Sequence, residues 1–127
     1  MTNDNKKIGF LGENIAARYL ESRGYRILAR NYQKPWGEID IIAEKEGVTI
    51  FCEVKTNSKE FGSSFSPELR VNPKKANHII RTASLYLNSQ NQNNGKEWRV
   101  DIVSIIINKL DKKASIVHFK NALANHQ

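Results

Sequence analysis

The sequence contains one cysteine, Cys52, among its 127 residues, so an internal disulfide is excluded. Cys52 lies at an apolar position of a predicted strand and is expected to act as a small hydrophobe, as in intracellular proteins. Long apolar runs are also missing, because residues 105–107 and their neighbours fall far short of the ~20 residues that span a membrane. Residues 1–7 are polar and lack the apolar core of a secretory signal. We therefore expect a cytoplasmic protein with no membrane partner.

Acidic residues are scarce relative to basic ones. Thirteen Asp and Glu face twenty Lys and Arg, which gives a net charge of +7 and a pI of about 9.6. Such a balance indicates an anionic partner, most often a nucleic acid, although a soluble basic protein without such a partner is the alternative. No internal repeat is present, and the length fits a single domain over residues 1–127.

Two short stretches place charged residues at alternate positions of apolar segments. In residues 37–42, Glu38 and Asp40 alternate with isoleucines, and in residues 51–55, Glu53 and Lys55 alternate with Cys52 and valine. Strand side chains point to opposite faces with a period of two, so Asp40 is predicted to face away from Ile39, Ile41 and Ala43. In the second stretch, Phe51, Glu53 and Lys55 share one face, and Ile50, Cys52 and Val54 share the other.

The charged turn at residues 44–47 ends in glycine and predicts a hairpin between these stretches. A loop of either two or four residues puts Asp40 on the face of Glu53 and Lys55. A two-residue loop sets Asp40 directly opposite Glu53, with Cβ atoms about 4.5–5.5 Å apart. Carboxylates this close repel each other unless a cation, such as a divalent metal ion, lies between them. The alternative is a solvated outer face with salt bridges.

Helical periodicity covers about residues 6–23. One apolar stripe contains Ile8, Leu11, Ile15 and Tyr19. Elsewhere on the helix Glu13 is surrounded by Gly9, Ala16, Ala17 and Leu20, and small residues allow a helix to approach a sheet closely. Glu13 is therefore either a solvated edge residue or a carboxylate directed at a shared site.

The complete pattern predicts a mixed five-stranded α/β sheet flanked by helices, in the order α-β-β-β-α-β-β. The second helix opens at Asn72-Pro73, where Asn caps and Pro fits the first turn, and it crosses over to the fourth strand.

The acidic and basic residues of the hairpin suggest phosphodiester hydrolysis. Asp40 and Glu53 are candidate ligands of Mg²⁺ or Mn²⁺, which binds carboxylates, water and substrate phosphate. Lys55 is a candidate for orienting or deprotonating the attacking water. Glu13 would extend the site if the first helix packs across this end of the sheet.

These residues carry a resemblance to known proteins. Asp40 followed by Glu53-Val54-Lys55 resembles the signature of the PD-(D/E)xK nuclease superfamily, which has a restriction-endonuclease-like three-layer fold. Nearly the whole chain resembles the bacterial UPF0102 (YraN-like) family, through Gly12-Glu13-Asn14-Ile15-Ala16-Ala17, Gly24-Tyr25, Asn31, residues 37–43 and 51–55, Ser66-Pro67, Lys75, Ala83, Tyr86-Leu87, Arg99, Asp101-Ile102-Val103 and Asn121-Ala122.

The family is similar in fold to archaeal Holliday junction resolvases. The resemblance implies an active site of Glu13, Asp40, Glu53 and Lys55, with the Val54 backbone carbonyl as a further metal ligand. Related proteins often carry an arginine shortly after the Glu-x-Lys element, where this chain has Thr56-Asn57.

Basic residues near the second helix are candidates for binding nucleic acid. Lys74 and Lys75 lie in its first turn, where the helix dipole disfavours cations unless an anion binds. The alternative is that both lysines extend into water. Arg70, in the preceding loop, would extend the basic surface. Elsewhere, Asp101 and Arg99 are expected to form a structural ion pair, and the histidines, including His118, have no metal-ligand spacing.

The sequence thus predicts a metal-dependent endonuclease for structured or branched DNA, of the Holliday-junction-resolvase type. It would act as a homodimer, because symmetric cutting of two strands needs two sites. A catalytically idle nucleic-acid-binding module of the same fold and a protein-interaction domain are the alternatives.

Overall fold

The computed structural model describes residues 2–59, 72–90 and 97–123. The elements follow the order α1 (Thr2–Ser22), β1 (Arg26–Lys34), β2 (Gly37–Lys45), β3 (Val48–Lys59), α2 (Pro73–Ser89), β4 (Trp98–Asn108) and β5 (Lys113–Phe119). This order confirms the predicted α-β-β-β-α-β-β arrangement. None of the helices in these ranges is long and apolar enough to cross a membrane.

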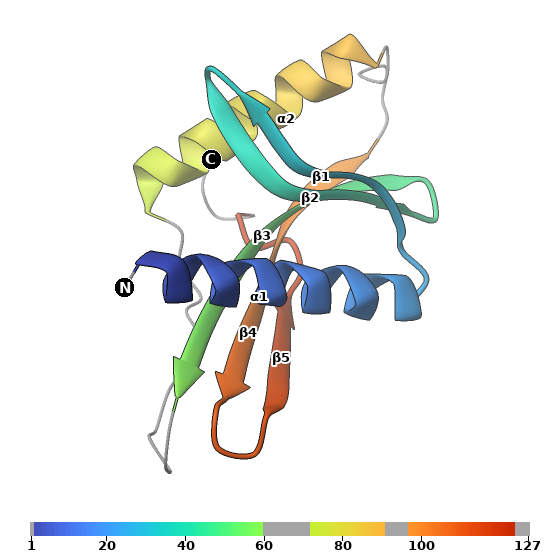
Figure 1. Ribbon diagram of the computed structural model, residues 1–127. Helices are drawn as coiled ribbons and strands as arrows, with labels where there is room; N and C mark the ends of the chain where they lie inside the picture. Colours follow the sequence, from blue (N-terminus) through green and yellow to red (C-terminus); the bar gives the residue numbers. More distant parts are fainter. Residues whose placement is uncertain (1, 60–71, 91–96, 124–127) are drawn as a thin grey trace.

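The five strands form one mixed sheet in the order β1-β2-β3-β4-β5. Only the β3–β4 pair is parallel among the described strands, and α2 provides the crossover that this pairing requires. Figure 1 shows α1 crossing in front of β3 and β4, with α2 on the other side of the sheet. The result is a three-layer α/β fold with β3 in the centre of the sheet.

Each helix covers its own hydrophobic core. The core under α1 contains Ala16 and Leu20 of the helix with Ile50, Cys52 and Val103 of the sheet. The core under α2 contains the other strand faces, in a set that includes Ile42, Phe51, Ile79, Ala83 and Ile102. Because both faces of β3 are covered, Glu53 and Lys55 are partly buried, and charged groups in such surroundings are stabilised by compensating partners.

The interior side of α1 differs from the expected stripe. Leu11 is 46% exposed, whereas Ala16 and Leu20 are fully buried. The small-residue face is the one that meets the sheet, because it allows the helix backbone to approach closely. A methyl group added at Gly12 would overlap with the side chain of Thr56 on β3. This close approach places Glu13 beside β3.

The predicted caps and turns are present. The side chain of Asn72 accepts a hydrogen bond from the Lys75 backbone amide at 2.8 Å, which caps α2. Lys45 pairs with Val48, so the β2–β3 hairpin has the two-residue loop Glu46-Gly47. Both loop residues have positive φ, at 51° and 82°, as the tight hairpin turn requires. β3 continues to Lys59, beyond the stretch of residues 51–55 in which the sequence shows alternating charges.

Candidate active site

The β2–β3 hairpin brings Asp40 and Glu53 to the same level of the sheet. The antiparallel pairing runs from Lys45 and Val48 to Ile41 and Cys52, and then ends. Asp40 and Glu53 are the next residues along the two strands, so they lie opposite each other where the strands separate. This is the register that the sequence predicted for a two-residue loop.

The separation of the strands determines how Asp40 is held. Its Oδ2 atom accepts a hydrogen bond from the backbone amide of Val54 at 2.8 Å. The carboxylate therefore takes the place of the β2 backbone carbonyl that would accept this hydrogen bond if the two strands were still paired. In an extended strand, the amide and the carbonyl of one residue point to the same edge. The Val54 carbonyl consequently faces the same gap as Asp40.

The predicted alternation of β2 is wrong at Ile39. Ile39 packs in the core under α2, whereas Ile41 and Ala43 pack under α1. The reason is that β2 turns at Asp40: it leaves β3 there but stays paired with β1 as far as Gly37. The alternation of β3 is confirmed, with Phe51 under α2 and Cys52 under α1.

Burial and like charge both act on Asp40. They raise its pKa from 3.8 to about 6, with burial as the largest cause and repulsion from Glu53 next. The Val54 amide and Lys75 act in the opposite direction. A carboxyl group with its pKa near neutrality, beside a second carboxylate, is a common property of catalytic and metal-binding sites.

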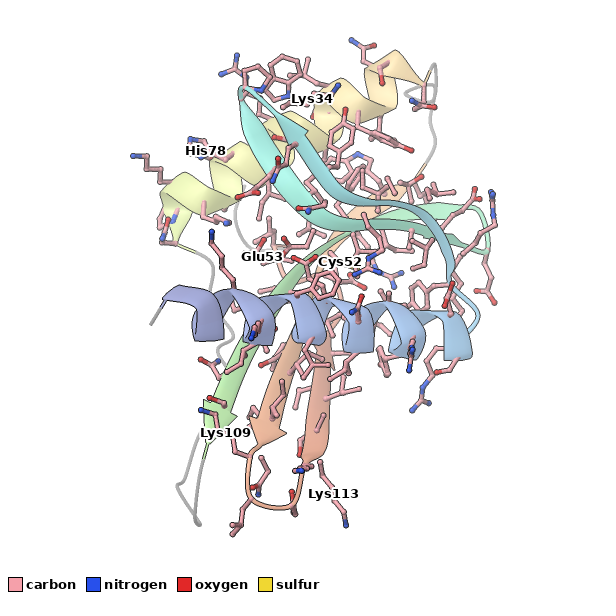
Figure 2. The ribbon with its side chains drawn as sticks, viewed as in Figure 1. Lys34, Cys52, Glu53, His78, Lys109 and Lys113 are labelled. Atoms are coloured by element: carbon pink, nitrogen blue, oxygen red, sulfur yellow. The ribbon has the colours of Figure 1, made fainter. Side chains whose placement is uncertain are left out.

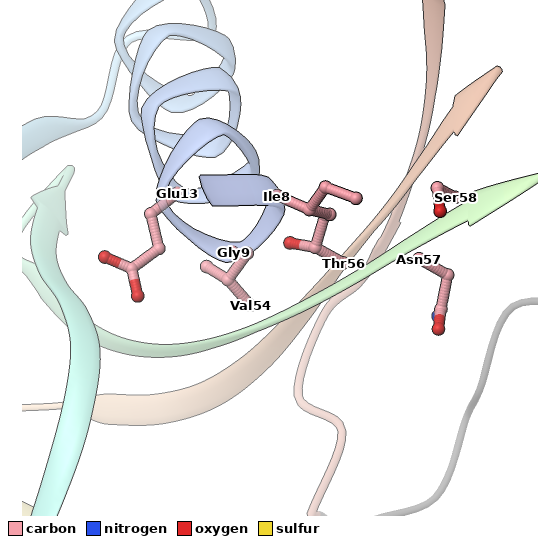
Figure 3. A pocket seen from close by; sticks show the side chains of 7 residues that line it. All are labelled: Ile8, Gly9, Glu13, Val54, Thr56, Asn57 and Ser58. Carbon is pink, nitrogen blue, oxygen red and sulfur yellow. The ribbon is translucent and has the colours of Figure 1, made fainter. Parts of the chain in front are cut away.

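Glu13 approaches this pair from α1. Its pKa is raised by burial first and by the Asp40 charge second, while Arg30 lowers it. Figure 3 shows its side chain extending from α1 beside Val54 of β3. The helix thus brings a third carboxylate within electrostatic range of Asp40, on the opposite side of the sheet from α2.

Lysines reach the site from β3 and α2. Lys75 Nζ lies 3.3 Å from Oε2 of Glu53, so the first turn of α2 supplies a direct ion pair. Figure 2 shows Glu53 and Cys52 on the central strand. Lys55 lies two residues beyond Glu53 on β3 and beside Ser104 of β4. Lys74 is exposed, and Arg70 lies outside the described residues.

The donor atoms at the gap suit one small, hard cation. Asp40, Glu53 and the Val54 carbonyl offer oxygen ligands, and Mg²⁺ commonly takes one or two carboxylates with water and substrate phosphate. Within residues 2–59, 72–90 and 97–123, no three His, Cys, Asp or Glu side chains are grouped closely enough to hold a metal ion by themselves. A metal bound at the gap would therefore have to take most of its ligands from water and substrate phosphate.

A buried network beneath α1 was only partly predicted. The ion pair of Arg99 and Asp101 is confirmed, with Nε and Oδ1 2.9 Å apart. His118 received no role from the sequence, yet its Nε2 lies 2.7 Å from Oδ2 of Asp101 and its Nδ1 lies 3.0 Å from the Tyr19 hydroxyl. Tyr19 and His118 are 99 residues apart, so no local spacing indicates this contact. The network ties α1, which carries Glu13, to β4 and β5.

Comparison with known proteins identifies the family. The model of "Uncharacterised protein family UPF0102" matches residues 12–105. The chain belongs to this family. A UPF0102 protein of Clostridium botulinum (strain 657 / Type Ba4) is 42% identical over 119 residues, which cover 93% of this chain and 94% of the relative.

Other UPF0102 proteins match over the same extent. The protein of Syntrophomonas wolfei is 41% identical over 119 residues, covering 93% of this chain and 98% of its own. The protein of Alkaliphilus oremlandii is 42% identical over 118 residues, with the same coverage. The matched segment of the family model includes Glu13, Asp40, Glu53, Val54 and Lys55.

Proposed function

We propose that this UPF0102 protein is a metal-dependent endonuclease that hydrolyses phosphodiester bonds in structured or branched DNA. The observation that carries the proposal is the Asp40–Glu53 pair at the point where β2 leaves β3. Its mutual repulsion contributes to the raised pKa of Asp40, and a bound cation would relieve this repulsion. The resemblance to PD-(D/E)xK nucleases and Holliday junction resolvases supports the same activity.

Asp40, Glu53 and the Val54 carbonyl would hold Mg²⁺ or Mn²⁺. The bound metal would supply charge neutralisation at the phosphate and a more acidic water. The Val54 amide holds the Asp40 carboxylate in place at 2.8 Å, so the protein itself orients this oxygen donor. Lys55, on the same strand face as Glu53, would orient the attacking water or take up its proton at Nζ. Glu13 would complete the acidic site from α1.

Lys74, Lys75 and Arg70 would bind the DNA backbone. Lys75 is already beside Glu53, and Lys74 precedes it in the first turn of α2. Backbone amides at a helix N-terminus favour phosphate, and a net charge of +7 favours a polyanion generally. Binding should consequently weaken as the salt concentration rises.

A DNA-binding protein without catalytic activity is the second candidate. The Lys75–Glu53 ion pair favours it, because a cation of the protein itself already neutralises one of the two carboxylates. This candidate binds DNA without metal and keeps its affinity after Glu53→Gln. The endonuclease requires that a metal compete successfully with Lys75.

A cleavage assay tests the proposal. Purified protein is incubated with Mg²⁺ or Mn²⁺ and with four-way junction, flap, duplex and single-stranded DNA. We expect cleavage of a branched substrate that Asp40→Asn and Glu53→Gln abolish. Glu46→Gln, in the exposed turn of the same hairpin, is the matched control and should keep activity. Cleavage that survives both site substitutions, or no cleavage of any substrate, would rule out the endonuclease.

We further propose that the active form is a homodimer, because two symmetric nicks across a junction need two active sites. Sedimentation of the protein with and without junction DNA tests this proposal. A monomer in both states would contradict it.

A further inference from the structure

A groove opens directly from the candidate active site, between the N-terminal half of α1 and the C-terminal half of β3 (Figure 3). Its volume is about 360 Å³, which is within the range of small-molecule sites. Its lining residues are Ile8, Gly9, Glu13, Val54, Thr56, Asn57 and Ser58. The lining shares Glu13 and Val54 with the candidate site, so the groove adjoins that site on the α1 side of β3.

The lining selects against phosphate. Within the described part of the chain, the lining contains no lysine, arginine or histidine, and its one ionisable side chain is Glu13. A phosphate would therefore meet negative charge without a compensating cation. Thr56, Asn57 and Ser58 instead offer neutral hydroxyl and amide groups, while Ile8 and Val54 offer apolar contact. A nucleobase, which is neutral, flat and rich in hydrogen-bonding groups, matches this lining.

Gly9 contributes the space itself. A Cβ atom added at Gly9 meets no other atom within 4 Å, whereas one added at Gly12 would collide with Thr56. The two glycines therefore have different roles. Gly12 lets α1 rest on β3, and Gly9 leaves room beside it.

From this combination we infer that the groove receives the base of the nucleotide next to the cleaved phosphodiester. The inference rests on the proposed endonuclease and specifies its substrate. A base can enter the groove only after it leaves its stack, and this costs least for an unpaired nucleotide. The preferred substrate is then DNA with an unpaired nucleotide at the cleavage position, as at a branch point or flap, and not continuous duplex.

A fluorescent base tests the inference by binding alone. The full-length protein is mixed, in EDTA, with a flap DNA that carries 2-aminopurine as the unpaired base at the branch. Among the described residues the lining holds no aromatic side chain that would quench it, so entry of the base should raise its fluorescence severalfold. Duplex DNA with the same base should show no rise.

Substitution of Gly9 links the signal to the groove. Gly9→Leu fills the space, favours the helix and meets no protein atom at its Cβ. We expect it to remove the fluorescence rise and to weaken flap binding about tenfold, with Gly9→Ala intermediate. Ser84→Leu, which adds the same side chain on the exposed side of α2, should bind like the wild type. Thermal unfolding verifies that each variant is folded.

The outcomes separate this inference from the proposed function. If the wild type cleaves flaps but Gly9→Leu and Gly9→Ala leave fluorescence and affinity unchanged, the inference is wrong and the endonuclease stands. If the wild type cleaves continuous duplex and flap equally and shows no fluorescence rise, the inference is also wrong and the endonuclease still stands. If no DNA is bound or cleaved by the wild type, the proposed function itself fails and the inference fails with it.

Discussion

The Asp40 carboxylate accepts a hydrogen bond from the Val54 backbone amide at 2.8 Å, across the gap that opens where β2 leaves β3. One side chain thus both completes the hydrogen bonding of the central strand and stands opposite Glu53. Its structural and its electrostatic effects on the protein can be separated by substitution.

Asp40→Asn should raise the stability of the metal-free protein at about pH 7. Asparagine keeps an acceptor for the Val54 amide but removes the charge whose burial and repulsion raise the Asp40 pKa. We expect a gain of about 1–2 kcal/mol in the free energy of unfolding. Asp40→Ala leaves the amide without its acceptor and should be about 1–3 kcal/mol less stable than Asp40→Asn. Chemical denaturation measures both differences. Equal unfolding free energies of Asp40→Asn and Asp40→Ala would contradict the role of the hydrogen bond from the Val54 amide.

Acidification should affect stability and metal binding in opposite ways. The folded pKa of Asp40, about 6, exceeds its ordinary value of 3.8, so the native state binds more protons than the unfolded chain between these values. The Asp40 contribution to stability therefore increases as the pH falls through this interval. The difference in unfolding free energy between wild type and Asp40→Asn isolates it from other groups.

Metal binding at the proposed site would require ionised Asp40, so Mn²⁺ affinity should fall about tenfold for each pH unit below the Asp40 pKa of about 6. Calorimetric titration at several pH values measures this. An affinity that does not change between about pH 5 and pH 7 would show that Asp40 is not a ligand.

Lys75→Gln and Lys74→Gln should have different effects on the Asp40 pKa, although the two lysines are adjacent. Both remove one positive charge from the first turn of α2, and each should reduce the salt dependence of DNA binding by about one unit of slope. Of these two lysines, it is Lys75 that pairs with Glu53 and lowers the Asp40 pKa. Lys75→Gln alone should therefore raise that pKa further, as followed by NMR of the Asp40 carboxyl carbon. An identical titration in both variants would contradict the geometry.

Gly12→Ala should destabilise the protein, whereas Gly9→Ala should not. The new methyl group at Gly12 would overlap with Thr56 Oγ1 and would push α1 away from β3. We expect a loss of about 1–3 kcal/mol. Gly9→Ala meets no neighbour within 4 Å and gains up to about 1 kcal/mol from helix propensity. Thermal unfolding of Gly12→Ala and Gly9→Ala measures the difference in stability that the close approach of α1 to β3 at Gly12 produces.

Asp101→Asn should be among the more damaging single substitutions. The Asp101 side chain is fully buried and accepts hydrogen bonds from Arg99, His118 and the Asn121 amide. Loss of its charge leaves Arg99 without a counter-ion, which should cost about 3–5 kcal/mol. Arg26→Gln is the matched control, because the Arg26 side chain in its ion pair with Glu44 is 72% exposed and should contribute less than about 1 kcal/mol. Similar losses of unfolding free energy for Asp101→Asn and Arg26→Gln, measured by denaturation, would contradict the importance of burial.

Local patterns predicted those features that depend on neighbouring residues. The alternation of Phe51 to Lys55, the cap at Asn72 and the hairpin register each follow from a few consecutive positions. The sequence also placed small residues around Glu13, and the contact with the sheet is confirmed for Ala16 and Ala17 but not for Gly9.

Features that depend on the path of the whole chain were missed. Ile39 changes sides because β2 turns at Asp40, and a strict period of two cannot express a turn within a strand. The apolar stripe of α1 is only partly used: Ile15 and Tyr19 pack against the core, but Leu11 is exposed, because the small-residue face allows the closest approach to the sheet. His118 and Tyr19 are brought together by the tertiary fold across 99 residues of sequence, so no local spacing reveals their contact.

The contact between Tyr19 and His118 also makes the anchoring of α1 depend on β5. The histidine lies 99 residues further along the chain than the tyrosine. The contact can form only when β5 is paired with β4, whereas the packing of α1 on β3 does not need it. The helix that carries Glu13 is therefore coupled to an edge strand that contributes no residue to the acidic site.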